Sequence, residues 1–149
     1  MKITGILFLL GTILVTAQNS KYLTDKGFVA EGYDVVAYFD HEALKGKDAF
    51  IAEYDDVKFR FSSFENKKKF ENNPTKYTPQ YGGYCAYAMG KSGGKVSINP
   101  KSYKIQDGKL YLFYDSIFVD TLKKWNKEGP EELQKKADTY WSALEKEKE

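Results

Sequence analysis

The sequence predicts an α+β fold, with a small antiparallel sheet, a helix after the second hairpin strand and two C-terminal helices. Three observations carry this prediction. Short runs rich in β-branched and aromatic residues occupy the first part of the chain. A sequence typical of a hairpin with a tight turn follows them. In the last part of the chain, apolar residues recur with the period of an α-helix. Strands that precede helices, instead of alternating with them, favour α+β.

Residues 1–17 have the pattern of a signal peptide. Lys2 precedes an apolar run from Ile3 to Val15, and small residues allow cleavage before Gln18. The run is shorter than the roughly 20 residues of a membrane-spanning helix. An uncleaved anchor is the alternative. We expect export to the periplasm or beyond the cell, without stable membrane insertion.

After cleavage, residues 18–149 should form one domain, with a core over about 32–114 and helices over about 115–146. Residues 19–26 are polar and predict a loose arm. Val35–Phe39 is apolar, β-branched and aromatic, which predicts a buried strand.

A hairpin should come next in the chain. Phe50–Tyr54 and Val57–Phe61 are strand-like, and Asp55-Asp56 lies between them at the position of a turn. Ser62-Ser63-Phe64-Glu65 then has the pattern of a capping box, with Ser62 as the expected N-cap. The helix should end near Asn72, with Phe64 and Phe70 facing the core.

The strongest hairpin signal lies at Tyr103–Phe113, where Asp107-Gly108 separates two alternating apolar runs. Two helices should follow it. The first is expected from Asp115 or Ser116 to Gly129, and the second from Pro130. The second carries an apolar stripe that we expect to pack within the chain, formed by Leu133, Ala137, Tyr140, Trp141 and Leu144.

Composition excludes several functions. The chain has 23 Lys and Arg against 21 Asp and Glu, so it offers no electrostatic case for binding nucleic acid or an anionic membrane. Arg60 is the single arginine, which excludes an arginine cluster for phosphate. The one histidine, His41, stands in an expected loop without a neighbouring nucleophile motif. We therefore expect no catalytic residues and no enzymatic activity.

The segment Tyr81–Gly90 is the most informative part of the chain, because it combines the one cysteine with adjacent glycines and three tyrosines. A helical turn beginning near Tyr84 would place Cys85 at its N-terminus and Met89 on the same face. Cys85 and Met89, with His41, could bind cuprous copper, which accepts two or three soft ligands. One cysteine also allows a free thiol or a disulfide-linked dimer, so monomer and dimer both stay open.

Two further interpretations of this segment stay open. In one, Gly82 and Gly83 form a tight turn and Cys85 is an inert buried thiol. In the other, the turn borders a pocket for a small ligand or a partner. The residues of that pocket would be Tyr81, Gly82, Gly83, Tyr84 and Tyr87.

Several of these motifs, in this order, resemble the exported YHS-domain proteins. The resemblance covers about Gly32 to Tyr114 and rests on Glu31–Phe39, Phe59–Ser63, Phe70, Asn73-Pro74, Lys76-Tyr77 and Pro79–Ala86. Members of the wider family are taken to bind or sense metals, through cysteines in a Phe-Cys-Ser segment and one helical turn further on.

The chain departs from that family at the metal ligands. Phe61 aligns with the family's phenylalanine, whereas Ser62 and Asn66 stand at the two cysteine positions. The resemblance therefore implies an exported binding module of the YHS type without the family's ligands. We expect a module that binds a soft metal such as copper through Cys85; the alternative is a small-ligand or protein-interaction domain in which the Tyr-Gly-Gly-Tyr-Cys motif is structural.

Overall fold

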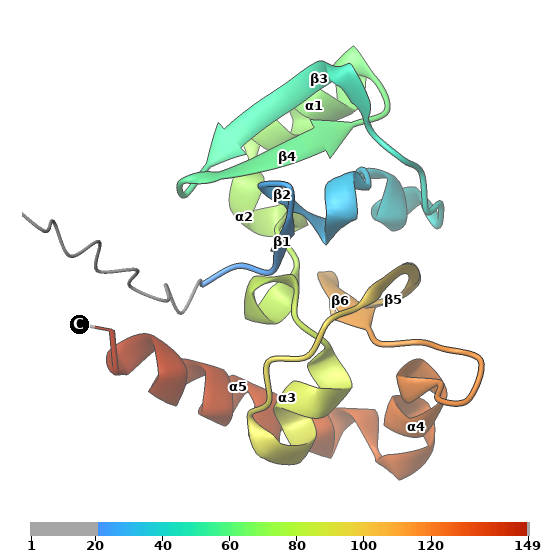
Figure 1. Ribbon diagram of the computed structural model, residues 1–149, viewed down its shortest axis with the longest axis vertical. Helices are drawn as coiled ribbons and strands as arrows, with labels where there is room; N and C mark the ends of the chain where they lie inside the picture. The colour runs from blue at the N-terminus through green and yellow to red at the C-terminus, as the bar shows by residue number, and fades with distance from the viewer. Residues whose placement is uncertain (1–20, 149) are drawn as a thin grey trace, which may run out of the picture.

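The computed structural model describes residues 21–148, so the expected signal peptide at 1–17 lies outside the described residues. The fold is α+β, as the sequence predicts: the described residues form two small sheets and five α-helices (Figure 1). Among these residues, no helix combines the length and the apolar character that crossing a bilayer requires.

The first layer is a four-stranded sheet in the order β1-β2-β4-β3. Its strands are β1 (Thr24–Asp25), β2 (Phe28–Val29), β3 (Lys47–Tyr54) and β4 (Val57–Phe61). The β2–β4 pair is parallel and the other pairs are antiparallel. Helix α1 (Phe64–Asn72) lies behind β3 and β4 in Figure 1.

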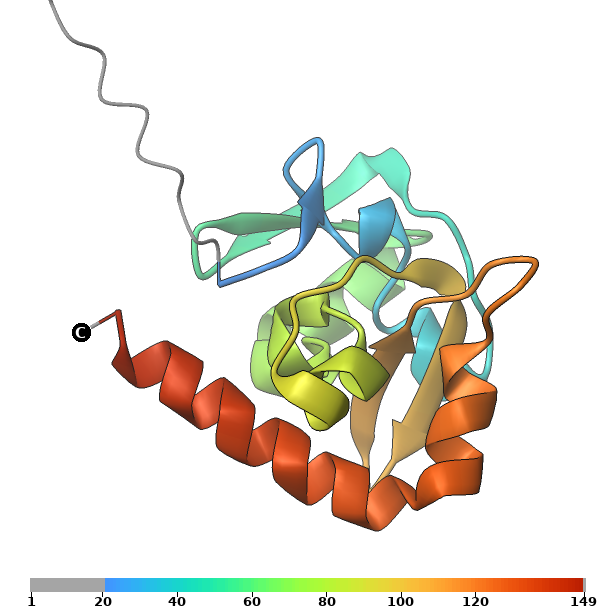
Figure 2. The same cartoon turned by 60° about the horizontal axis from the view of Figure 1, so that its bottom comes forward.

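The second layer is the hairpin of β5 (Asn99–Gln106) and β6 (Lys109–Phe113) with three helices. These are α3 (Ala86–Ser92), α4 (Thr121–Glu128) and α5 (Pro130–Lys146), and α5 runs past α3 along the lower edge of the molecule (Figure 2). The short helix α2 (Pro74–Tyr77) and the 3-10 helix η3 (Gln80–Gly83) connect the layers.

Each layer has an aromatic cluster at its centre. In the first, the ring of Phe70 lies 4.5 Å from that of Phe59 and 5.1 Å from that of Phe61, centroid to centroid. In the second, Trp125 is fully buried against Tyr111 and Phe113. Both clusters follow from strand alternation and helical periodicity, which place these side chains on inward faces.

The two predicted hairpins are confirmed. Asp55 and Asp56 both have positive φ angles, 51° and 63°, between β3 and β4. Asp107 and Gly108 have φ of 52° and 70° between β5 and β6. Positive φ at both central residues is what a tight primed turn requires, and aspartate and glycine tolerate it.

The predicted strand at Val35–Phe39 is wrong, although these residues are largely buried as expected. The chain forms the 3-10 helix η2 (Ala37–Asp40) instead. Asp34 Oδ1 accepts hydrogen bonds from the backbone amides of Val36 and Ala37. This side-chain turn uses the amides that a strand would need for a neighbouring strand.

Several boundaries also differ from the prediction. The segment expected to be a loose arm is packed from residue 21 onward: Tyr22 is buried and Thr24–Asp25 is strand β1. The N-cap of α1 is Ser63, not Ser62, since Ser63 Oγ accepts from the amide of Asn66. Phe64 is 60% exposed, so it does not face the core.

The first C-terminal helix begins later than expected. Asp115 and Asp120 form an isolated β-bridge, and Asp120 is the N-cap of α4 because its side chain accepts from the amide of Lys123. The second helix, α5, begins at Pro130 as predicted. Within its stripe, Leu133 and Ala137 are buried, whereas Tyr140 is 42% exposed.

Candidate functional site

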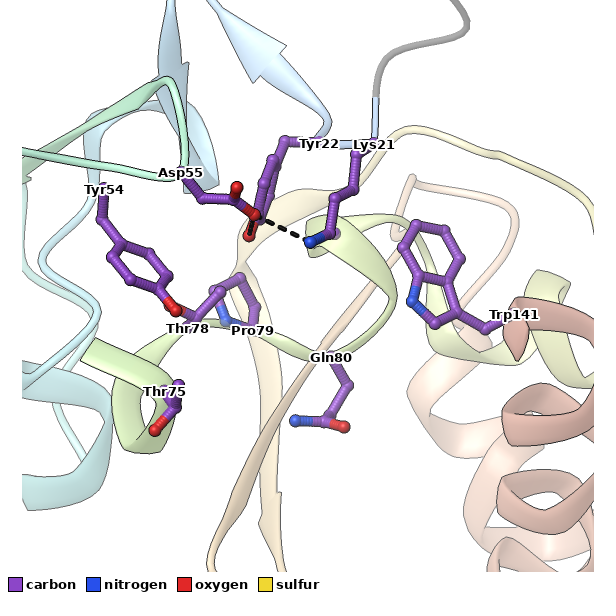
Figure 3. Close-up of a pocket in the computed structure, with 10 residues that line it drawn as sticks. Lys21, Tyr22, Tyr54, Asp55, Thr75, Thr78, Pro79, Gln80 and Trp141 are labelled. Carbon is purple, nitrogen blue, oxygen red and sulfur yellow. Dashed lines mark hydrogen bonds and ion pairs between the residues drawn. The ribbon is translucent and has the colours of Figure 1, made fainter. Parts of the chain in front are cut away.

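The structure has a cleft beside the Gly82 turn, between the two layers (Figure 3). Four parts of the chain form it: the N-terminal arm (residues 21–23), the β3–β4 turn, the α2–η3 segment and the C-terminal half of α5. Its volume is about 210 Å³. The residues that line it are Lys21, Tyr22, Tyr54, Asp55, Thr75, Thr78, Pro79, Gln80, Gly82 and Trp141.

Gly82 fixes the N-terminal arm at the cleft. Its φ angle is 61°, and its carbonyl oxygen accepts a hydrogen bond from the amide of Leu23 at 2.9 Å. A Cβ at this position would overlap the carbonyl oxygen of Lys21 and come within 3.1 Å of the Trp141 indole. Glycine therefore lets the arm approach the turn closely enough to bring Lys21 and Tyr22 to the cleft.

An ion pair crosses the top of the cleft. Lys21 Nζ lies 2.7 Å from Asp55 Oδ2, and the Tyr22 hydroxyl donates to the same oxygen at 2.8 Å. The hydrogen bond from Lys21, followed by that from Tyr22, lowers the pKa of Asp55. The bond to Asp55 likewise raises the pKa of Lys21. At neutral pH the pair thus carries both charges and adds no net charge to the cleft.

Aromatic and polar side chains form the remaining walls. Tyr54 and Trp141 are both partly exposed and stand on opposite sides, with Lys21 and Gln80 between them (Figure 3). Aromatic neighbours surround Trp141: its ring centroid lies 6.3 Å from Tyr81 and 6.5 Å from Tyr84. The cleft therefore offers two ring surfaces beside hydroxyl, amide and charged groups.

Of the five residues predicted for a ligand pocket, Gly82 alone lines this cleft. Gly83 has a φ of 83° and continues the turn, which confirms the tight turn expected from the two glycines. Tyr81 is buried, and its hydroxyl donates to Asp138 at 2.8 Å. Tyr84 packs against Trp141, and Tyr87 donates to Glu128 on α4.

The structure also places the three predicted copper ligands. Cys85 is the N-cap residue of α3, as the sequence predicts, and it is fully buried. Its Sγ accepts from the amide of Tyr114 at 3.3 Å and lies 3.5 Å from Thr121 Oγ1. Met89 is also fully buried. His41 is exposed and ends η2 with a φ of 63°.

The two predicted sulfur ligands pack in different clusters. The Cys85 side chain packs in the larger core cluster, which includes Phe59 and Phe70, whereas Met89 packs in the cluster around Trp125. Among residues 21–148, no group of three or more His, Cys, Asp or Glu side chains could hold a metal ion. An ion could reach Cys85 only if the core opened, and the same holds for a disulfide to a second copy. Copper binding and the disulfide-linked dimer stay predictions.

Sequence reasoning missed the buried carboxylate of Asp34, which accepts hydrogen bonds from Ser62 and Asn66. Asp34 is fully buried, and its Oδ2 accepts from Ser62 N, Ser62 Oγ and Asn66 Nδ2 at 2.6–2.8 Å. Ser62 and Asn66 are the residues that the resemblance to the YHS family aligns with its cysteines. A hydrogen-bonded carboxylate thus joins the start of η2, the residue after β4 and helix α1, and its donors are neutral.

The cleft residues were missed for a different reason. Tyr22, Tyr54 and Trp141 lie far apart in the sequence, and none belongs to a motif. Asp55 was recognised only as a turn residue. Two signals lay at the cleft: the predicted pocket at the glycine turn included Gly82, and the apolar stripe expected on α5 included Trp141.

Comparisons with known proteins give no further guide. Neither the protein-family models, the curated proteins nor the solved structures gave a match to this chain. The YHS resemblance therefore stays a prediction, and the function is argued from the residues of the cleft.

The burial of Cys85 leads to a testable expectation. In the folded chain its thiol should react with a maleimide at least about 100-fold more slowly than in urea, because reaction requires local opening of the core. Samples quenched at successive times and analysed by mass spectrometry give both rates of modification. The control is Cys85→Ser combined with Ser142→Cys, which moves the thiol to an exposed position on α5. Similar folded and unfolded rates for Cys85 would show that the thiol is accessible.

Proposed function

We propose that this chain is an exported, non-enzymatic binding module of the YHS type, which holds a small organic molecule in the cleft between Tyr54 and Trp141. One observation carries the proposal: two partly exposed aromatic side chains stand on opposite sides of a hollow that also contains an ammonium, a carboxylate, hydroxyls and an amide. Ligand sites commonly combine apolar walls with a few placed polar groups.

The composition of the cleft favours binding over catalysis. His41 and Cys85 are not among its lining residues. The charged groups of Lys21 and Asp55 pair with each other, and burial raises the pKa of Tyr22 well above its usual value. A general acid or base works best with a pKa near the working pH, and these shifts move the groups away from it. The cleft therefore suits recognition.

Cuprous copper bound through Cys85 is the competing proposal, and the described residues support it less. Its two sulfur ligands are both buried and lie in different clusters. A titration with cuprous copper in the presence of a competing chromophoric chelator tests this proposal. The chain from Gln18 onward and its Cys85→Ser variant are compared. Capture that depends on Cys85 would favour copper over the cleft ligand.

Chemical-shift mapping tests the cleft directly. We expect some members of a library of small polar and aromatic compounds to shift amide signals of the N-terminal arm, the α2–η3 segment and the Trp141 indole. Trp141→Ala should weaken such binding about tenfold or more, because the ligand loses an aromatic contact. The matched control is Phe118→Ala, since Phe118 is 89% exposed on the β6–α4 loop, away from the lining residues.

Two results would contradict this function. One is that no compound shifts the cleft signals at millimolar concentration. The other is that binding is unchanged in Trp141→Ala, or weakened equally in Phe118→Ala. Either result would leave the cleft as a surface hollow without a recognition role.

A further inference from the structure

We infer that the cleft takes an uncharged, hydroxyl-rich ring compound: a monosaccharide, or one sugar unit of a glycan. This inference rests on the proposed function and narrows it to a ligand class. Three features of the cleft carry it: the paired charges, the orientation of two threonine hydroxyls, and the aromatic walls.

The paired charges disfavour a strongly charged ligand. Lys21 and Asp55 are 2.7 Å apart, and Tyr22 donates to the same carboxylate oxygen. An anionic ligand at Lys21 would lie beside the carboxylates of Asp55 and Glu145, which are 2.7 Å and 4.0 Å from the ammonium. A cationic ligand at Asp55 would lie beside the ammonium of Lys21. Each would meet a like charge, although water screens the repulsion because the side chains are nearly half exposed. A neutral ligand can use the spare donors of the ammonium and the spare lone pairs of the carboxylate together.

The threonine hydroxyls show which groups the ligand must bring. Thr78 Oγ1 donates to the carbonyl oxygen of Pro74 at 2.8 Å, and Thr75 Oγ1 donates to Asn73 Oδ1 at 3.2 Å. A hydroxyl has one proton and two lone pairs, so both threonines present acceptors to a ligand. A ligand that donates at this wall leaves both threonine hydrogen bonds intact, whereas at Lys21 the ligand must accept. Hydroxyl groups do both.

The aromatic walls of the cleft suit the apolar C–H faces of a sugar ring. A pyranose has C–H faces as well as hydroxyls, and the partly exposed rings of Tyr54 and Trp141 offer apolar surfaces to such a face. The volume of about 210 Å³ is smaller than the roughly 300–1,000 Å³ of sites for drug-sized ligands. One ring matches this size, and a longer glycan would extend out of the cleft.

The experiment is a titration of the chain from Gln18 onward, followed by amide chemical shifts. The probes are glucose, galactose, mannose and N-acetylglucosamine, with glucuronate and glucosamine as charged counterparts and cyclohexanol and phenol as apolar rings. At least one neutral sugar should shift the cleft signals with an affinity about threefold or more above its charged counterpart. A matching trisaccharide distinguishes the sources: tighter binding than the monosaccharide indicates a glycan end, and equal binding indicates the free sugar.

Two threonine variants test whether the hydroxyls of the cleft accept from the ligand. Thr78→Val and Thr75→Val keep the side-chain shape and remove the acceptor, so each should weaken sugar binding about fivefold to tenfold while cyclohexanol binding stays the same. Phe118→Ala should change nothing. If the cleft binds only charged or apolar compounds, the ligand class is wrong and the proposed function stands. If no probe and no library member shifts the cleft signals, both are wrong.

Discussion

Replacing Asp34 by alanine should lower the free energy of unfolding by about 3 kcal/mol or more, because several buried donors then lose their acceptor. The carboxylate accepts five hydrogen bonds from three parts of the chain. The donors are the amides of Val36 and Ala37, the amide and hydroxyl of Ser62, and the side-chain amide of Asn66. Since Asp34 is fully buried, water cannot replace the lost acceptor without entering the core.

Urea denaturation followed by far-UV circular dichroism measures this loss. Asp34→Asn keeps one acceptor oxygen and should be intermediate. Asp40→Asn is the matched control, because Asp40 is exposed in the same segment and should change stability by less than about 0.5 kcal/mol. A stability of Asp34→Ala within 1 kcal/mol of the original chain would show that the carboxylate does not hold these elements together.

Asp34 also shows where sequence reasoning stops. The hairpin turns at Asp55-Asp56 and Asp107-Gly108 were predicted correctly, since their signal is local: residues that tolerate positive φ stand between alternating strands. The role of Asp34 depends on Ser62 and Asn66, about thirty residues away. Asp34 lies within the Glu31–Phe39 motif, but no local pattern there shows that its carboxylate is buried and accepts from Ser62 and Asn66. The 3-10 helix that replaces the predicted strand depends on this same side chain.

Cys85 illustrates the same limit at the candidate site. Its place at the start of α3 was predictable from the glycines before it. The direction of its side chain was not, because an N-cap residue has non-helical backbone angles and need not share a face with Met89. Tertiary packing decided that the two sulfur atoms enter different clusters. The cleft depends on packing still more, since it joins Lys21 to Trp141.

Replacing Gly82 by alanine should release the N-terminal arm and lower the free energy of unfolding by about 3 kcal/mol or more. A Cβ would overlap the carbonyl oxygen of Lys21, so the arm cannot stay in place. The chain then loses the hydrogen bond between Leu23 and Gly82 and the burial of Tyr22, which is 6% exposed. Full burial of a large side chain contributes roughly 1.5–3 kcal/mol, and the positive φ adds about 1 kcal/mol of strain.

Gly108→Ala is the control that separates the loss of the arm's contacts from the backbone strain at positive φ. Gly108 has a similar φ of 70°, but a Cβ there meets no atom within 4 Å, so this variant should lose only the roughly 1 kcal/mol of backbone strain. Urea denaturation gives both losses, and limited trypsin digestion reports on the arm through cleavage after Lys26. Because the arm carries Lys21 and Tyr22 to the cleft, Gly82→Ala should also abolish ligand binding, whereas Gly108→Ala should keep it. Equal losses of stability in the two variants would mean that the close approach of the arm to the glycine turn contributes nothing.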